Sequence, residues 1–251
     1  YDTLFSAWGN PSSQYPFGKQ AKAQLDDARE TVAAALGCKA SELIFTSCGS
    51  ESDNWAIRLA AHQNRHVGKH IITTAVEHSA VLEPCRALEQ EGYSVTYLKP
   101  DKNGNITASQ VENALRDDTA LVTMMLVNNE TGCIFPVAEV AQLLKAKKSR
   151  ALLHTDAVQA FLKIPFRADT LGADLISVSG HKIHAAKVTD DQIVCGRQRI
   201  FFPNCAARKT RNAYGIPALF KLLFGPKSLA GGSRRSNQQL HRKWNLTQSR
   251  I

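Results

Sequence analysis

The sequence of 251 residues lacks any apolar run of about 18 residues, the length that marks a membrane-spanning helix. It also lacks the charged and then apolar leader that opens a secretory signal. We therefore expect neither a transmembrane span nor a secreted protein, and no membrane partner. The composition, with 43% hydrophobic and 21% charged residues, is that of a globular protein.

Cysteine is present but has no pattern that would predict a metal or disulfide site. The six cysteines are Cys38, Cys48, Cys85, Cys133, Cys195 and Cys205. None belongs to a C-x-x-C pair, which argues against a metal site and against a disulfide framework. Unpaired, scattered cysteines are typical of a reducing compartment, so we expect a cytoplasmic protein.

Acidic residues are missing from the last part of the chain. From residue 192 to the end there are twelve Lys and Arg and no Asp or Glu, although about seven acids are usual in 60 residues. The remainder holds nineteen basic and twenty-two acidic residues, so the net charge of +9 comes from the tail. We predict two parts: an ordinary domain over residues 1–187 and a divergent basic segment over 188–251.

Apolar strand-like runs alternate with segments of helical periodicity up to about residue 180. The predicted strands are 42–46, 70–74, 94–98, 120–127, 151–155 and 174–178. The predicted helices are about 21–36, a segment ending near 61, 79–90, 108–116 and 136–147. This alternation predicts an α/β fold with a mostly parallel sheet flanked by helices on both faces.

Polar clusters follow five of these strands. They are 47–50, 77–78, 128–132, 156–159 and 179–182. Taken singly, each has an ordinary explanation: His78 as a core or cap histidine, Asn129 as a turn residue, Asp156 as a helix cap and Lys182 as a surface lysine. All five lie at the carboxyl ends of strands, where α/β sheets bind ligands, so together they favour a binding site.

The residue types in these clusters suit one cofactor, pyridoxal phosphate. A lysine that is partly desolvated can act as an amine nucleophile, and Lys182 is the candidate. The cofactor needs a carboxylate beside its ring nitrogen, for which Asp156 is available, and an imidazole such as His78 can cover the ring. A Gly/Ser helix start at Gly49 and Ser50 can bind the phosphate. Side-chain amides for the phenolic oxygen are offered by Asn129 and Gln159.

Six motifs occur in an order and at spacings that resemble a known family. They are Asn10-Pro-Ser-Ser, residues 45–54 (FTSCGSESDN), Glu77-His78, residues 128–132 (NNETG), residues 154–159 (HTDAVQ) and residues 179–184 (SGHKIH). Over about residues 9–187 the chain resembles the cysteine desulfurases, relatives of selenocysteine lyase within the class V aminotransferases. The resemblance implies the large domain of a fold-type I pyridoxal-phosphate enzyme.

The resemblance implies a role for each candidate around the cofactor ring. Lys182 would form the Schiff base with the cofactor, and His78 would stack on the ring and relay protons. Asp156 would pair with the ring nitrogen and Gln159 with the phenolic oxygen. Asn129 would lie beside that oxygen and the substrate.

The resemblance also implies a phosphate site, an activity and partners. Gly49, Ser50, Ser179 and His181 would bind the phosphate. The enzyme would convert L-cysteine to L-alanine and carry the sulfur as a persulfide on one of its own cysteines. The sulfur would then pass to an acceptor protein, such as an iron–sulfur cluster scaffold or a tRNA-thiolating protein. A homodimer is expected, because the pocket in this family is completed across two subunits.

The two ends of the chain depart from the family pattern, and two alternatives stay open. We expect an N-terminally incomplete large domain, with residues 188–251 replacing the small domain that would supply the persulfide cysteine. The first alternative is a non-catalytic pyridoxal-phosphate-binding remnant, truncated or frame-shifted. The second is a nucleic-acid-binding role for the basic tail, whose cations would contact phosphates. No motif of a known module supports that role, so we favour no nucleic-acid partner.

Overall fold

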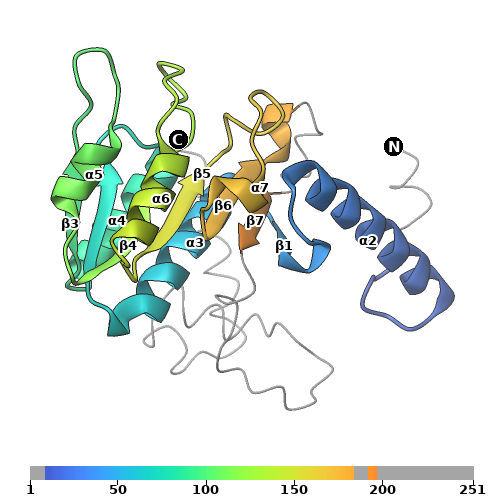
Figure 1. Ribbon diagram of the computed structural model, residues 1–251. Helices are drawn as coiled ribbons and strands as arrows, with labels where there is room; N and C mark the ends of the chain where they lie inside the picture. The colour runs from blue at the N-terminus through green and yellow to red at the C-terminus, as the bar shows by residue number, and fades with distance from the viewer. Residues whose placement is uncertain (1–8, 184–191, 197–251) are drawn as a thin grey trace, which may run out of the picture. The chain divides into compact units, whose positions relative to one another are not determined.

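The computed structural model describes residues 9–183 and the backbone of residues 192–196. These residues contain a seven-stranded sheet with the strand order β1-β7-β6-β5-β4-β2-β3 (Figure 1). The strands are β1 (Leu43–Thr46), β2 (His70–Thr74), β3 (Ser94–Leu98), β4 (Thr119–Thr123), β5 (Leu152–Asp156), β6 (Leu175–Ser179) and β7 (Gln192–Gly196). Of the basic segment 188–251, only the backbone of residues 192–196 is described, and Cys205 lies outside the described residues.

The sheet is parallel apart from β7. Strands β3, β2, β4, β5 and β6 pair in parallel, whereas β7 runs antiparallel to both of its neighbours, β6 and β1. Strand β1 therefore points the same way as the other parallel strands, and their carboxyl ends share one edge. The expected mostly parallel α/β fold is confirmed, but β7 was not predicted. Its apolar run Ile193-Val-Cys195 is too short to predict a strand by itself. The segment is a strand because it pairs with both β1 and β6.

Helices and short 3-10 turns connect the strands. The helices are α2 (Pro16–Leu36), α3 (Gly49–Gln63), α4 (Ser79–Gln90), α5 (Ala108–Ala114), α6 (Val137–Ala146) and α7 (Ala168–Leu171). The 3-10 turns are η1 (Ala40–Glu42), η2 (Asn64–His66) and η3 (Gly180–Ile183). Helix α2 ends where expected, at Gly37, whose φ of 76° is left-handed and costs glycine little. No helix in the described part of the chain is long and apolar enough to cross a membrane.

Helices cover both faces of the sheet, as alternating side chains show. Ile71, Leu121 and Leu175 pack in one apolar cluster with residues of α3 and α4. Their strand neighbours Ile72 and Ile176 belong to a second cluster, which includes residues of α2, α5, α6 and α7. Successive strand side chains point to opposite faces, so β2, β4 and β6 each contribute to both clusters. The same alternation decides which polar side chains lie on the α3 face near the carboxyl edge.

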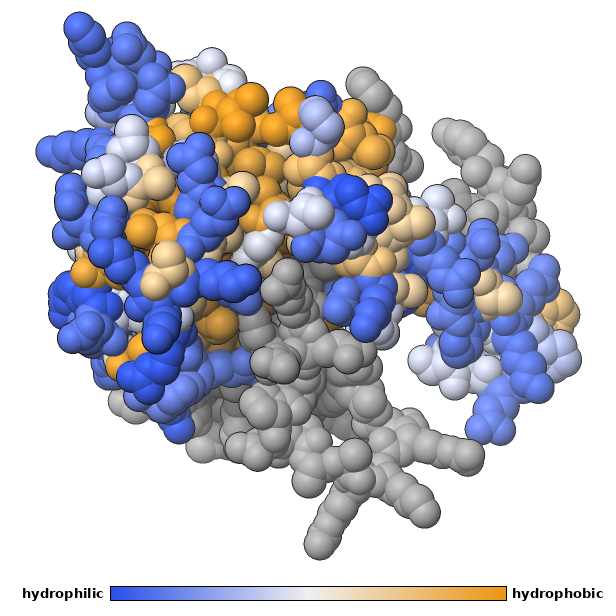
Figure 2. All heavy atoms as spheres, viewed as in Figure 1, coloured by the Kyte–Doolittle hydropathy of each residue, from blue (hydrophilic) through white to orange (hydrophobic). Residues whose placement is uncertain are grey.

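Helix α2 buries only part of its apolar stripe. Ala21 and Leu36 are buried, but Leu25 is 37% exposed and Phe17 is 52% exposed. In Figure 1 this helix extends away from the strands, and in Figure 2 its surface is mainly hydrophilic with a few apolar side chains. The helical period therefore predicted the helix correctly. It does not imply that the apolar side chains are buried along the whole helix.

Candidate functional site

The structure brings all the predicted site residues to the carboxyl edge of the parallel strands. Asp156 ends β5 and Ser179 ends β6, while the others stand in the segments that follow β1, β2, β4, β5 and β6. Those others are Gly49, Ser50, His78, Asn129, Gln159, His181 and Lys182. This edge is the ligand-binding edge of open α/β sheets, so the topology agrees with the placement expected from sequence.

Asp156 is a nearly buried carboxyl group at this edge. Its side chain is 7% exposed, and its Oδ1 accepts a hydrogen bond from the backbone N–H of Val158 at 2.9 Å. Burial raises the pKa of Asp156, whereas the Val158 hydrogen bond and the nearby His78 lower it. A carboxyl group so placed needs a cation or a donor to stay ionised. Asp156 is thus suited to pair with a protonated ring nitrogen.

His78 is the N-cap residue of α4. Its Nδ1 accepts a hydrogen bond from the backbone N–H of Ala80 at 3.1 Å, and the residue is exposed. The cap alternative raised by the sequence is therefore correct for this nitrogen. Because Nδ1 accepts, the proton of the neutral ring lies on Nε2, which leaves Nε2 able to exchange a proton with a ligand. Capping also fixes the orientation of the ring.

The N-terminus of α3 offers an anion site. The cap residue Cys48 makes no side-chain hydrogen bond to the first turn, so the N–H groups of Gly49 and Ser50 are not capped by a side chain. The Glu51 carboxylate accepts the N–H and the hydroxyl of Ser47 at 2.6 Å each, which holds the preceding loop. Uncapped N–H groups and the helix dipole together favour a phosphate.

The turn after β6 lies close to that helix start in the sheet. Thr46 of β1 and Ser179 of β6 both pair with Gln192 of β7, so their strands are two spacings, about 10 Å, apart. Ser179 is fully buried, and its Oγ lies 2.5 Å from Nδ1 of His181. Lys182 is exposed within η3. The turn therefore presents a lysine and a hydroxyl–imidazole pair near the α3 N-terminus.

Asn129 stands in an exposed loop whose shape depends on its neighbour. The Asn129 amide donates to Oε1 of Glu130 at 2.6 Å. The preceding Asn128 is buried, accepts the N–H groups of Glu130 and Thr131, and donates to the carbonyl of Val76. Asn128 thus ties this loop to the segment that leads into His78, a role that the sequence did not assign to it.

Gln159 is half-buried in the turn after β5, and its oxygen is already engaged. Oε1 of Gln159 accepts a hydrogen bond from Nζ of Lys163 at 2.8 Å. The amide nitrogen is the group that can donate to a ligand, which is what a phenolic oxygen requires. The arrangement leaves the predicted role of Gln159 compatible with the fold but untested by it.

Three buried ionisable residues behind the site belong to the quoted motifs, but the sequence assigned them no role of their own. Glu77 is 6% exposed, and its Oε1 accepts hydrogen bonds from Thr74 Oγ1 at 2.7 Å and from the Met125 N–H at 3.0 Å. Its Oε2 is buried without a hydrogen-bond partner, and burial raises the pKa of Glu77 to about 8. Asp53 and His154 are also buried here. The sequence did contain one indication of this cluster. His154 stands two residues before Asp156, so the two side chains lie on the same face of the strand.

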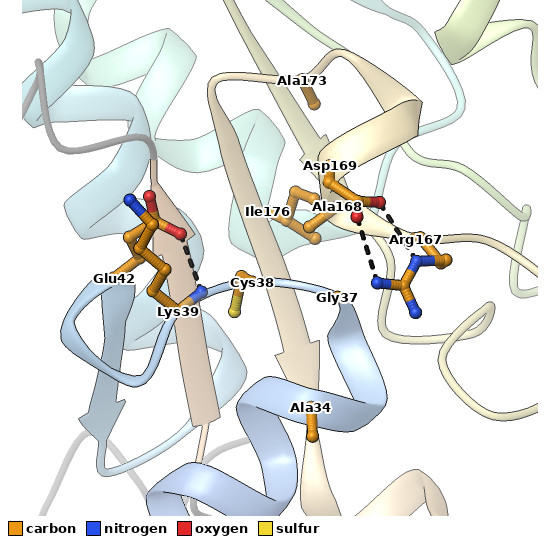
Figure 3. Close-up of a pocket in the computed structure, with 10 residues that line it drawn as sticks. All are labelled: Ala34, Gly37, Cys38, Lys39, Glu42, Arg167, Ala168, Asp169, Ala173 and Ile176. Atoms are coloured by element: carbon orange, nitrogen blue, oxygen red, sulfur yellow. Dashed lines mark hydrogen bonds and ion pairs between the residues drawn. The ribbon is translucent and has the colours of Figure 1, made fainter.

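A separate hollow of about 430 Å³ lies at the other side of the sheet, near the end of α2 (Figure 3). It is lined by Gly37 and Cys38 and by Ile176 from the middle of β6. Among its charged lining residues, Arg167 pairs with Asp169, and the Glu42 carboxylate accepts the backbone N–H of Lys39. None of the predicted site residues lines this hollow, so size alone does not identify the functional site.

Comparison with known proteins gives a family and several relatives. Residues 3–189 match the family described as "Aminotransferase class-V". The chain is 49% identical over 183 residues to the putative cysteine desulfurase IscS 1 of Bacillus subtilis, covering 73% of this chain and 48% of the relative. It is 47% identical over 180 residues to the cysteine desulfurase IscS of Methanosarcina thermophila. That match covers 72% of this chain and 44% of the relative. The chain spans about half the length of these curated relatives.

Solved structures agree with the fold. A NifS-like protein superposes with a TM-score of 0.75 at 38% identity, covering 79% of this chain and 54% of that one. A structure of SspA in complex with cysteine gives a TM-score of 0.73 at 35% identity, covering 78% and 55%. DndA from Streptomyces lividans gives a TM-score of 0.69 at 42% identity, covering 78% of this chain and 54% of that one. These structures share the α/β architecture described above.

Proposed function

Because the chain belongs to the aminotransferase class-V family, we propose that it is the cofactor-binding part of a pyridoxal-phosphate-dependent cysteine desulfurase. The reaction would convert L-cysteine to L-alanine and leave the sulfur as a persulfide on an enzyme cysteine. The named relatives, which are cysteine desulfurases, support this choice of reaction and substrate. We assign the persulfide to none of the described cysteines.

One observation carries the proposal: a lysine, a nearly buried carboxyl group and an uncapped helix start share one edge of the sheet. Asp156 lacks a buried cation as partner in the described part of the chain, and the Val158 N–H and His78 are what favour its ionised form. A protonated pyridine ring would supply the missing positive charge. Gly49 and Ser50 fit the phosphate through their N–H groups. The residues present therefore fit pyridoxal phosphate.

Each side chain then has a defined task. Pyridoxal phosphate, when bound, supplies an electron sink for bonds at the substrate α-carbon. Lys182 would hold the cofactor and would carry protons to and from the substrate. Asp156 would pair with the ring nitrogen and favour its protonated form. His78 offers Nε2 for proton exchange, since its Nδ1 is held by Ala80.

The remaining residues bind and orient. Ser179 and His181, joined at 2.5 Å, would complete the phosphate site together with the α3 N-terminus. Asn129 would donate its amide N–H to the phenolic oxygen in place of its bond to Glu130. Gln159 would donate through its amide nitrogen, while its oxygen keeps the bond from Lys163. Both amides lie on segments at the carboxyl edge of the sheet.

Partners and location belong to the same proposal. We assign the chain a homodimeric state, and an iron–sulfur scaffold or tRNA-thiolating protein as sulfur acceptor, on the basis of the family resemblance. A cytoplasmic location is proposed as well, because none of the four described cysteines is in a disulfide. Light scattering of the full chain would test the dimer.

The test begins with the visible spectrum of the full chain after addition of pyridoxal phosphate. We expect a visible band that borohydride bleaches, lost in Lys182→Ala and kept in the control Lys147→Ala, whose lysine pairs with Glu112 on the surface. No band in the wild type would overturn cofactor binding. L-Cysteine is then added, and alanine and sulfide are measured. A band without alanine would instead support the non-catalytic remnant.

A further inference from the structure

A buried row of polar side chains crosses three strands behind Asp156. His154 of β5 is fully buried, with Nδ1 2.8 Å from Oγ1 of Thr123 on β4 and Nε2 3.0 Å from Oγ of Ser177 on β6. Both hydroxyls can donate or accept, so either neutral tautomer of the imidazole is satisfied. Burial lowers the pKa of His154 to about 3, so the ring is neutral at physiological pH. The row is therefore a neutral hydrogen-bonded unit.

This row and Asp156 share the face of the sheet that α3 covers. Ser177 is the register partner of Asp156, and His154 stands two residues before it on the same strand. Two-residue periodicity places all three side chains on one face. Asp53 lies on α3, which covers this face, and its Oδ1 is 3.6 Å from Nε2 of His154. Ser177 thus lies beside Asp156 in the sheet and forms a hydrogen bond with Asp53.

The surroundings of Asp53 disfavour the ionised form of its carboxyl group. It is 1% exposed, and its Oδ1 has no hydrogen-bond partner. Burial raises its pKa well above the usual value, and repulsion from Asp156 adds to this, while a hydrogen bond with Ser177 opposes it. Glu77 is the other charged group that acts on it, also as a repulsive carboxyl. No cation is among the groups that shift Asp53 in the described part of the chain.

Three carboxyl groups in one buried cluster cannot all be ionised, since each buried negative charge needs compensation. Asp156 is the most exposed of the three, at 7% against 1% for Asp53 and 6% for Glu77. It also has His78 as a neighbour that favours its ionised form. The neighbouring groups therefore favour the ionised form at Asp156 over Asp53 and Glu77.

We propose that Asp53 is a positioning residue that stays a neutral carboxylic acid and fixes the Thr123–His154–Ser177 row behind Asp156. Asp156 is then the one carboxylate of the cluster that faces the cofactor ring. The part of this inference that concerns the ring rests on the proposed function. The neutral acid itself is a property of the chain alone and can be measured without cofactor.

The first experiment is infrared spectroscopy of the full chain without cofactor at neutral pH. Aspartate is labelled with a carbon isotope in its side-chain carboxyl, so that the carbonyl stretch of a protonated Asp separates from that of Glu. We expect an isotope-shifted band of protonated aspartic acid in the wild type and in Glu77→Gln, and its loss in Asp53→Asn. Absence of this band in the wild type would overturn the proposal.

The second experiment follows the visible absorbance of the bound cofactor against pH. Asp53→Asn replaces the neutral acid with a neutral amide of the same shape, and its midpoint should stay within about 0.3 pH unit of the wild type. Asp53→Leu and the smaller change Ser177→Ala disrupt the row, which weakens the ionised form of Asp156. A less positive ring makes the lysine-derived nitrogen more basic, so the midpoint should rise by about one pH unit.

The outcomes separate a positioning role from a merely structural one. A shift in Asp53→Asn as large as that in Asp53→Leu would mean that Asp53 is charged, and would overturn the proposal. Unchanged midpoints in Asp53→Leu and Ser177→Ala, with both variants folded by circular dichroism, would overturn it as well. A chain that binds no pyridoxal phosphate would contradict the proposed function, while the infrared result would still decide the state of Asp53.

Discussion

Replacing Glu77 with Gln removes an ionisable group whose burial makes folding depend on pH. Glu77 is 6% exposed and accepts hydrogen bonds from Thr74 and Met125 through Oε1 alone. Burial raises its pKa from 4.5 to about 8, and the two hydrogen bonds only partly oppose this. Gln keeps the accepting oxygen and the shape of the side chain, but it cannot titrate.

The sign and size of the effect follow from proton binding. Between about pH 4.5 and pH 8, Glu77 has lost its proton in the unfolded chain and keeps it in the folded one. The folded state then binds more protons, so the free energy of unfolding of the wild type falls as the pH rises. Each pH unit in this window costs about 1.4 kcal/mol for one group. From pH 5 to pH 8 the wild type should lose about 4 kcal/mol that Glu77→Gln does not lose.

Urea denaturation of the full chain without added cofactor, followed by Trp fluorescence at several pH values, measures this difference. Trp55 on α3 is a partly buried reporter. The Gln amide can change the free energy of unfolding by a constant amount at every pH. The quantity to compare is therefore the slope of the unfolding free energy against pH. Glu83→Gln, on the exposed side of α4, controls for the loss of a surface charge. Parallel stability curves for the wild type and Glu77→Gln would refute a protonated Glu77.

Three further changes test packing and local structure, each by urea denaturation. Leu153→Ala leaves a cavity at a site 1% exposed and should cost about 2–5 kcal/mol; a cost below 1 kcal/mol would contradict the described core. Gly172→Ala should cost at least about 1 kcal/mol, because φ is 82° and the new Cβ would lie 2.7 Å from Cβ of Ala141. Thr107→Ala removes the α5 capping box with Gln110 and should cost about 1 kcal/mol, whereas Thr107→Ser should restore stability.

Much of the fold could be predicted because local periodicity and tertiary pairing agree. The predicted ranges 70–74, 79–90 and 94–98 match β2, α4 and β3. The predicted strand 120–127 ends earlier, at Thr123, although Met124 and Leu126 still donate hydrogen bonds to His154 and Asp156. Strand β7 was missed because two neighbouring strands define it, and neighbours in space are not visible in a short apolar run.

The candidate site was predictable in position but less so in detail. Strand ends followed by polar clusters identified the correct edge, since parallel strands align their carboxyl ends. The acids behind it stood in the quoted motifs, but their burial was not predicted, because the burial of Asp53 depends on how α3 packs over β5 and β6. Hydrogen-bond partners were equally hidden: Asn129 and Gln159 bond to side chains on their own segments. The predicted roles of the site residues stay predictions until the cofactor is bound and measured.

The most direct measurement is mass spectrometry of the full chain after incubation with pyridoxal phosphate and reduction with borohydride. A reduced adduct is stable to digestion, so the modified lysine can be located by peptide mapping. We predict one pyridoxyl phosphate group per chain on Lys182, with the exposed Lys147 unmodified under the same conditions. Label spread over surface lysines, or no label on Lys182, would contradict the assignment of this chain as a pyridoxal-phosphate enzyme.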